Sequence, residues 1–408
     1  MTARPKHIIY PLHYFDFSWN RSEKTIEEFE AKLAEHLGDG VYVKLIGRAR
    51  AGLFLLAKLA IGGVRKKVIL SPFTIPDVVN MVKFAGAQPV FVDVVRDSTN
   101  IDLDHLCDLI DESTCCVIVT HYHFNHAQMD EIRKVCAEKN IMLVDDCALA
   151  FGASESNGRM IGTTTDASVF SFSGFKTLNF FWGGAITTRS PELAKRISHE
   201  IRDWRPLRRS QYLEQLLKIL KYDLMTRKGA FSAITFPLLR RKVLRENNQE
   251  ILPMVRVESK EVNQTILSRP SPWAIQEWNR KLETVGAFAQ HRRAIAAVYD
   301  KTLQAHLVSK ETPIAARTNS CLVNYPIIVG ARSRTEIFKR IMSEGFDAGL
   351  SLYPNVHEMQ GFERIPGESA NVSRLIRTVI SLPTHPRISK EYASDLSQVV
   401  SSAIYATA

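Results

Sequence analysis

The sequence predicts an α/β protein with a mostly parallel sheet in a large domain, followed by a smaller C-terminal α+β domain. Short, continuous apolar runs alternate with amphipathic stretches through the first half of the chain, at residues 68–70, 90–92, 116–119 and 141–144. Such runs are typical of parallel strands that helices cover on both faces. The length of 408 residues suits two packed domains, and the composition, 45% hydrophobic and 24% charged, is that of a globular protein.

Helical patterns accompany these strands. Thr25-Ile26-Glu27-Glu28 has the form of a capping box, and apolar residues follow it at helical spacing as far as Gly38. A second, mostly apolar helix is expected from about Arg50 to Leu59. Two further strands are expected at residues 167–172 and 184–188, so Lys176 lies on the connection between them.

We expect three parts along the chain: an N-terminal arm and large domain at residues 1–200, a basic helical insertion at 201–264, and the small domain at 265–408. One long helix is expected from Trp273 to about Leu303. A strand near 322–329 and a helix near 334–344 should follow it.

The six cysteines form no C-x-x-C pair, and two of them are adjacent in an apolar run; they are Cys107, Cys115, Cys116, Cys136, Cys147 and Cys321. This usage is typical of buried, reduced thiols in a cytoplasmic protein. No apolar run has the length of a membrane span, and we identify no signal peptide at the N-terminus.

The net charge of +10 is concentrated in one segment. Residues 201–260 hold 14 Lys and Arg against 6 Asp and Glu, a net of +8. The segment also carries an apolar stripe, made of Tyr212, Leu213, Leu216, Leu217, Ile219 and Leu220. We expect this stripe to pack on the body of the protein or on a partner subunit. The alternative is contact with an anionic membrane surface. Nucleic-acid binding is not expected, because the sequence has no helix-turn-helix or zinc-finger pattern.

Three features of the first half fit one phosphorylated cofactor. The first is the small-residue turn Gly47 to Gly52, directly before a helix. Backbone N–H groups at a helix N-terminus suit a phosphate, and Arg50 could add a charged contact. Because similar turns also occur in plain loops, this feature alone is weak.

The second feature is the pair Asp145-Asp146 at the end of the strand 141–144. Ligands of such sheets bind at the carboxyl ends of the strands. A carboxylate facing a pyridine nitrogen would keep it protonated, so the ring could accept electrons. Ala148 is small enough to let a ring lie against the backbone. The alternative is two solvated carboxylates.

The third feature is Lys176, which follows Val169-Phe170-Ser171-Phe172-Ser173-Gly174-Phe175 and precedes Gly183-Gly184. Apolar surroundings would desolvate the amine and lower its pKa, which favours Schiff-base formation. The alternative, an ordinary surface lysine, is disfavoured by the aromatic neighbours.

The order of these motifs resembles the DegT/StrS family of pyridoxal-phosphate-dependent sugar aminotransferases. The residues that carry the resemblance are Phe73 to Asn80, Phe84 to Asp93, Asp145 to Leu149, Gly158 to Gly162, Phe170 to Lys176, Gly183-Gly184 and Ser381 to Pro386. The resemblance covers about residues 26–200 and 265–400. It implies the fold type I of pyridoxal-phosphate enzymes.

The resemblance also implies roles for single residues. Lys176 would be the Schiff-base lysine and proton shuttle, and Asp146 the partner of the pyridinium nitrogen. The other cofactor positions would be Ala148, Ser171 as a phosphate ligand, Arg50 and Ala51 at the phosphate turn, and Ile75 where relatives stack an aromatic ring. Substrate contacts would come from His121, Tyr353 and His357.

Three positions depart from the family pattern. Leu149 replaces a polar residue on the hydroxyl side of the cofactor, Ile75 is not aromatic, and Leu267 stands where the family has an asparagine that reaches the partner subunit. These changes do not affect the residues expected to carry the cofactor chemistry, but they leave the identity of the substrate undetermined.

The function implied by the resemblance is transfer of an amino group from an amino acid, with glutamate the expected donor, to a nucleotide-linked keto-sugar. The family forms homodimers with active sites at the subunit interface. Alternatives are a keto-cyclitol or another carbonyl acceptor, cofactor-dependent sugar dehydration, in which relatives replace the lysine by histidine, and a non-catalytic basic surface-binding protein. The spacing His121, His123, His126 could indicate zinc, but spacing alone is non-specific, and no metal is expected.

Overall fold

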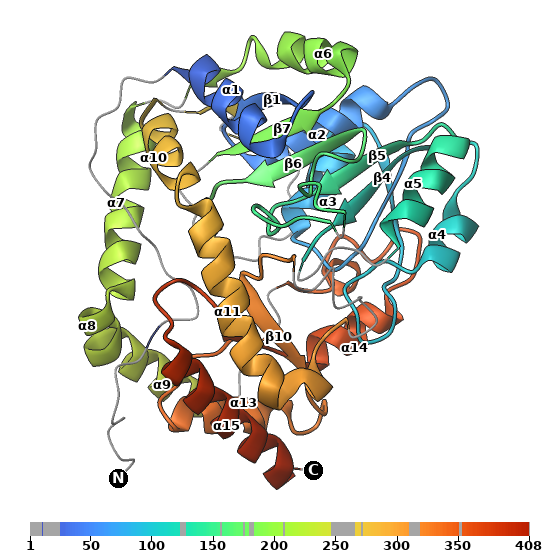
Figure 1. The fold of residues 1–408 in the computed structure, drawn as a ribbon. Coiled ribbons are helices and arrows are strands. Elements are labelled where there is room, and N and C mark those ends of the chain that lie inside the picture. The colour runs from blue at the N-terminus through green and yellow to red at the C-terminus, as the bar shows by residue number, and fades with distance from the viewer. Residues whose placement is uncertain are drawn as a thin grey trace.

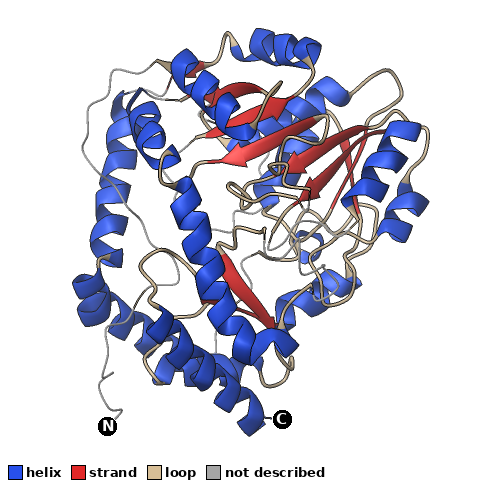
Figure 2. Ribbon diagram, in the orientation of Figure 1, coloured by secondary structure: helices blue, strands red, loops and turns tan. Residues whose placement is uncertain are grey.

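The structure of the chain is a computed structural model. It describes residue 10 and residues 25–122, 128–155, 157–173, 176–178, 183–206, 209–245, 266–270, 272–309, 319–350 and 353–407. A large sheet with its helices occupies one half of the molecule, and a second group of helices around a small sheet occupies the other (Figures 1 and 2).

The main sheet has seven strands in the order β1-β7-β6-β5-β4-β2-β3. Its strands are β1 (Tyr42–Ile46), β2 (Lys67–Leu70), β3 (Gln88–Phe91), β4 (Thr114–Thr120), β5 (Met142–Asp146), β6 (Ala167–Ser171) and β7 (Gly184–Thr188). The four pairings from β3 to β6 are parallel, which confirms the predicted mostly parallel sheet. The pairings of β7 with β6 and with β1 are antiparallel. The sequence could not indicate this, because a buried apolar run looks the same in either direction.

Helices cover both faces of the sheet (Figure 2). They are α1 (Ile26–Leu37), α2 (Ala49–Ala60), α3 (Pro76–Phe84), α4 (Leu103–Leu109), α5 (Met129–Glu138) and α6 (Pro191–Ile201). Alternate residues of the strands enter different cores: Val68 and Leu70 pack with α2 and α3, whereas Ile69 packs with α4 and α5. The predicted capping box is present, because the Thr25 hydroxyl accepts from the Glu28 N–H and the Glu28 carboxylate accepts from the Thr25 N–H.

The small sheet pairs β10 (Asn324–Ile328) with β11 (Val379–Pro383) in antiparallel fashion. Around it lie α11 (Val285–Leu303), α13 (Arg334–Ser343), α14 (Ala370–Thr378) and α15 (Lys390–Thr407), with the short helix η2 (Gln304–His306). The short helix η3 (Val356–Glu358) packs its Val356 into the core of the main sheet. The strand near 322–329 and the helix near 334–344 are thereby confirmed.

The expected single helix from Trp273 to Leu303 is wrong. The chain forms two helices, α10 (Pro272–Leu282) and α11, which are separated at residues 283–284. Trp278 and Leu282 of α10 pack into the core beside β6, and so do Val285 and Ala289 at the start of α11. Tyr299 and Leu303, further along α11, pack into the core of the small sheet.

The described part of the basic segment, residues 209–245, is helical, and a short parallel pair, β8 (Arg205–Pro206) and β9 (Ser268–Arg269), lies on either side of it in the sequence. Between them lie α7 (Arg209–Thr226), α8 (Lys228–Ala230), the π-helix η1 (Phe231–Thr235) and α9 (Phe236–Arg245). Phe231, Phe236 and Val243 are buried in the core of the small sheet.

Two expectations about burial are corrected. Leu213, Leu217 and Leu220 of the predicted apolar stripe are exposed, so these three side chains do not pack on the body of this chain. Cys107 is exposed on α4, while the other five cysteines are buried as free thiols. Among the described helices, none combines the length and apolar character needed to cross a bilayer.

Candidate active site

A cavity lies at the carboxyl ends of β4, β5 and β6, where Thr120, Asp146 and Ser171 end or nearly end the strands. Its other walls are the start of α2, the start of α3, and Tyr353 from the C-terminal half. It is lined by Arg48, Ala49, Arg50, Leu53, Thr74, Ile75, Val78, Thr120, Tyr122, Asp146, Ala148, Leu149, Ser171, Ser173, Lys176, Gly183 and Tyr353. Open parallel sheets bind ligands at this end of their strands.

Asp146 and Lys176 face the same cavity. Burial raises the pKa of the Asp146 carboxyl, and the N–H of Ala148, which donates to Asp146 Oδ1 at 3.0 Å, opposes this shift. Burial lowers the pKa of the Lys176 amine to about 8, and the Asp146 charge opposes that shift in turn. A lysine of this kind is more often neutral near pH 8 than an ordinary lysine, and a neutral amine is a nucleophile.

The start of α2 forms the end of the cavity suited to an anion. Arg48, Ala49 and Arg50 line it, and across from them lie the Ser171 and Ser173 hydroxyls, 3.1 Å apart. Gly184 makes this arrangement possible: a Cβ there would stand 3.0 Å from the Ala49 nitrogen. The first turn of a helix, two hydroxyls and a guanidinium are a typical phosphate-binding set.

Two residues of the predicted phosphate turn differ in detail from the expectation. Ala51 does not line the cavity, and its N–H donates to the Arg48 carbonyl at 3.0 Å. Arg50 lines the cavity but also forms an ion pair with Asp77 of α3. The turn therefore presents Arg48, Ala49 and Arg50 to the cavity, whereas the sequence indicated Arg50 and Ala51.

An aromatic group closes the side of the cavity near Leu149. The ring of Tyr122 lies 4.8 Å from that of Phe73 and 5.2 Å from that of Tyr353. Burial raises the pKa of both tyrosines well above the ordinary value. Sequence reasoning identified Tyr353 but missed Tyr122, although Tyr122 directly follows the strand 114–120 and stands next to His121, where it could have been considered.

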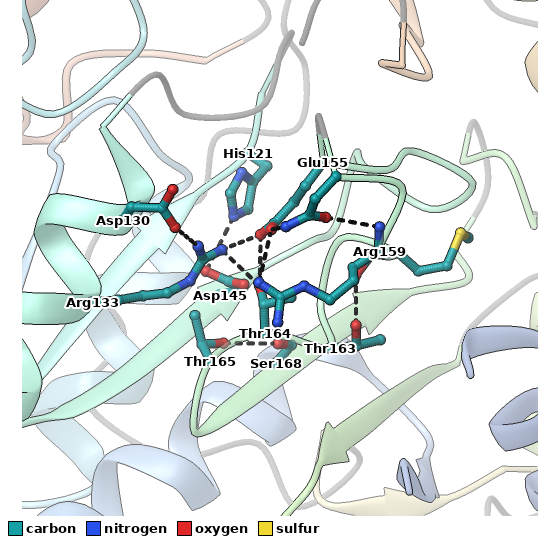
Figure 3. A network of polar contacts seen from close by, with 12 residues as sticks. His121, Asp130, Arg133, Asp145, Glu155, Arg159, Thr163, Thr164, Thr165 and Ser168 are labelled. Atoms are coloured by element: carbon teal, nitrogen blue, oxygen red, sulfur yellow. Dashed lines mark hydrogen bonds and ion pairs between the residues drawn. The ribbon is translucent and has the colours of Figure 1, made fainter. Parts of the chain in front are cut away.

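His121 and His357 are close to this region without lining the cavity. His121 is buried, and its Nε2 lies 3.1 Å from Asp145 Oδ1 (Figure 3). Nδ1 of His357 lies 3.1 Å from the Ser369 hydroxyl, and its ring packs beside Phe91. Their predicted substrate contacts thus receive no support from the described cavity, whereas Tyr353 is in place for one.

His121, Asp145 and Cys147 place three possible metal-ligand atoms within 4.8 Å of one another. Burial raises the pKa of the Cys147 thiol well above its ordinary value, and the carboxylates of Asp145, Asp146 and Glu155 act in the same direction. His123 and His126 lie outside the described residues.

Figure 3 shows a polar network beside His121 and Asp145. The network holds the loop that follows β5. Arg133 of α5 forms ion pairs with Asp130 and Glu155, and its Nη2 donates to the Thr164 hydroxyl at 2.7 Å. The loop that carries Gly158 and Gly162 is thereby attached to a helix of the sheet. The network supports the end of β5 without entering the cavity.

The chain is similar in sequence to known proteins. A transaminase from Micromonospora megalomicea, named for dTDP-3-amino-3,4,6-trideoxy-alpha-D-glucose, is 27% identical over 90% of this chain and 86% of its own length. A Campylobacter jejuni transaminase, named for UDP-4-amino-4,6-dideoxy-N-acetyl-beta-L-altrosamine, is 34% identical over 43% of this chain. That match spans 46% of the relative, and several other matches likewise span about half of the relatives' length.

Solved structures agree in fold. Helicobacter pylori PseC, an aminotransferase involved in the biosynthesis of pseudoaminic acid, superposes with a TM-score of 0.71 at 19% identity, over 94% of this chain and 92% of its own. The DegT/DnrJ/EryC1/StrS aminotransferase profile matches residues 13–208 and 278–402. With the fold, the cavity and this match in agreement, the chain belongs to the DegT/DnrJ/EryC1/StrS aminotransferase family.

Proposed function

We propose that the chain is a pyridoxal-phosphate-dependent aminotransferase that moves an amino group from an amino acid to the keto group of a nucleotide-linked sugar. The observation that carries the proposal is the position of Lys176 and Asp146 in one cavity that has an anion-binding end. Glutamate is the first donor to test.

The donor set of the cavity fits pyridoxal phosphate. The α2 N-terminus, Arg50 and the hydroxyls of Ser171 and Ser173 would hold the phosphate. The buried carboxyl group of Asp146 would face the ring nitrogen. The amine of Lys176 would bind the aldehyde of the cofactor. When bound, the cofactor supplies an electron sink for the carbon that loses a proton.

The protein's own contribution is to place a base and exclude water. Lys176, whose pKa is lowered to about 8 by burial, can accept a proton and return it near neutral pH. The Asp146 carboxyl lines the cavity where it could pair with a cation of the ring. Tyr122, Tyr353 and Leu149 form a mostly apolar wall, which keeps the dielectric low and strengthens both effects.

The substrate class is supported by the relatives, whose names refer to dTDP-, UDP- and GDP-linked sugars. A keto-cyclitol or another carbonyl compound is the alternative acceptor. We keep this alternative because Ile75 and Leu149 differ from the residues that the family usually has at these positions. We also propose a homodimer, as the family resemblance implies, which sedimentation of the purified protein would test.

The proposal is tested by loading the protein with cofactor, reducing it with borohydride and mapping the modified peptide. Modification of Lys176, and its loss in Lys176→Arg, would support the proposal; Lys195→Arg, on the exposed part of α6, is the control. A panel of keto-sugar nucleotides and keto-cyclitols then identifies the acceptor. Protein that cannot be loaded would instead favour a non-catalytic role, and turnover of cyclitols alone would overturn the sugar assignment.

A further inference from the structure

Four leucines of α7 form an exposed stripe that we call the leucine face: Leu213, Leu217, Leu220 and Leu224. Their spacing of four, three and four residues places them on one side of the helix. Their exposed fractions are 56%, 67%, 42% and 61%. Large aliphatic side chains of a folded protein are rarely left in water in such a row.

The leucine face lies within a wider concentration of exposed apolar residues. Among the described residues, twelve large hydrophobic side chains are exposed, and nine of them lie between residues 213 and 244. Besides the leucine face they are Tyr222, Met225, Ile234, Leu238 and Leu244. In Figure 1, α7 lies at the outer edge of the molecule, with α10 and α11 between it and the main sheet. This surface is therefore separate from the active-site cavity.

The exposure is not the result of a segment detached from the protein. Phe231, Phe236 and Val243, which lie in the same stretch, are buried in the core of the small sheet. Arg240 donates from Nη2 to the Ser343 carbonyl at 2.7 Å, and Arg387 donates to the Thr226 carbonyl. The segment is thus held against the body by one side, while the leucine face points outward.

The same segment is strongly basic. Residues 209–245 contain nine Lys and Arg against two Asp and Glu, a net of +7. Glu214 forms an ion pair with Lys218 of α7, and Asp223 forms one with Arg227, which directly follows α7. The basic surplus is therefore carried by other residues, among them the exposed Arg241, Lys242 and Arg245 of α9.

We propose that residues 209–245 dock on the surface of an anionic phospholipid bilayer. The leucine face would enter the boundary between headgroups and acyl chains, while the lysines and arginines contact the phosphates. Since no described helix can cross a bilayer, the association is peripheral. The proposed acceptor sugar, or the product it enters, would then be handled next to a membrane surface.

The charge of residues 209–245 favours an anionic bilayer over a second copy of the chain as the partner of this surface. A symmetric pair would bring the same basic segment against itself, +7 facing +7, and like charges in contact are repulsive. Nucleic acid would satisfy the charges but leave the leucines in water. An anionic bilayer satisfies both features of the surface.

The test is flotation of the full, cofactor-loaded protein with vesicles of phosphatidylcholine alone or mixed with phosphatidylglycerol. We expect binding to the mixed vesicles at low salt, little binding to phosphatidylcholine, and a decrease as added salt shortens the range of electrostatic attraction. Leu217→Gln combined with Leu224→Gln should weaken binding at least about tenfold, because the two leucines would no longer be buried in lipid. Arg241→Gln combined with Lys242→Gln should also weaken it.

Matched controls change equally exposed groups elsewhere. Val64→Gln replaces an apolar residue that is 83% exposed after α2, and Lys195→Gln removes an exposed charge from α6. Both should bind like the unchanged protein. Absence of binding to phosphatidylglycerol vesicles at low salt, or equal binding by the double leucine variant, would overturn the proposal. So would dissociation of an oligomer by the leucine variant without vesicle binding in the parent protein, which would assign the face to a second copy.

Discussion

Nε2 of His121 lies 3.1 Å from Oδ1 of Asp145, and both side chains are almost completely buried. The contact has the distance of an ion pair without the alignment of a hydrogen bond. Asp146, the next residue on β5, points to the opposite face and lines the cavity. Two adjacent carboxylates therefore have different surroundings, and we expect them to have different roles.

Removal of the His121 side chain is expected to reduce stability. In His121→Leu the Asp145 carboxylate would stay buried without its partner, at a cost of about 2 kcal/mol in the free energy of unfolding. Urea unfolding measures this loss. Asp130→Asn, which breaks an ion pair of Arg133 at the surface, is the control and should change the free energy by less than about 1 kcal/mol. Equal losses in the two variants would contradict the prediction.

The two carboxylates should differ in catalysis. Asp146→Asn removes the negative charge beside the proposed ring nitrogen, so the half-reaction with glutamate should slow by roughly 10²–10³-fold. Asp145→Asn leaves the cavity unchanged and should slow it by less than about tenfold. Single-turnover absorbance measurements of both variants, with circular dichroism to check folding, give the comparison. A larger effect for Asp145→Asn would show that Asp146 is not the residue that contacts the ring.

Cofactor attachment should depend on pH through Lys176. Burial lowers the pKa of this amine from 10.5 to about 8, so the reactive neutral form accumulates as the pH rises through 8 and then levels off. The rate at which pyridoxal phosphate reacts with cofactor-free protein should follow the same curve.

The variant Asp146→Asn tests how the Asp146 charge affects this pH dependence. The Asp146 charge raises the Lys176 pKa, so its removal should shift the midpoint to lower pH. Stopped-flow absorbance across a pH series measures both midpoints. A midpoint near 10.5 in the unchanged protein would show that Lys176 is not desolvated, and an upward shift in the variant would show that the Asp146 charge does not raise the Lys176 pKa.

Gly183 should tolerate no side chain. A Cβ at this position would lie 1.9 Å from Cζ2 of Trp278, and its φ of +155° is unfavourable for other residues. Gly183→Ala is expected to lower the free energy of unfolding by more than about 2 kcal/mol and to weaken cofactor binding. The control is Gly286→Ala, inside α11 with open space around it, which should stabilise the protein by roughly 0.5–1 kcal/mol. Thermal unfolding of both variants distinguishes them.

Much of the fold could be predicted because its signals are local. The capping box at Thr25 and the apolar runs of β2, β4 and β5 each lie within a few residues, and the structure confirms them. Strand β1 was missed because its five residues include Lys44 and show no continuous apolar run. The break between α10 and α11 was missed because apolar residues on both sides of it, Leu282 and Val285 among them, pack into the same core and continue the helical pattern.

From the sequence alone we could predict the α/β class, the family and the two residues on which the proposed chemistry depends, Lys176 and Asp146, because each of these residues follows a buried strand in a recognisable local pattern. The three-dimensional structure was needed to show that Tyr122 joins the cavity wall, that His121 lies against Asp145, and that the leucine face points away from the body. These outcomes depend on contacts between residues far apart in the chain, or on which side of a helix the core covers. Periodicity identifies an apolar stripe, but the packing of the whole chain decides whether that stripe is buried.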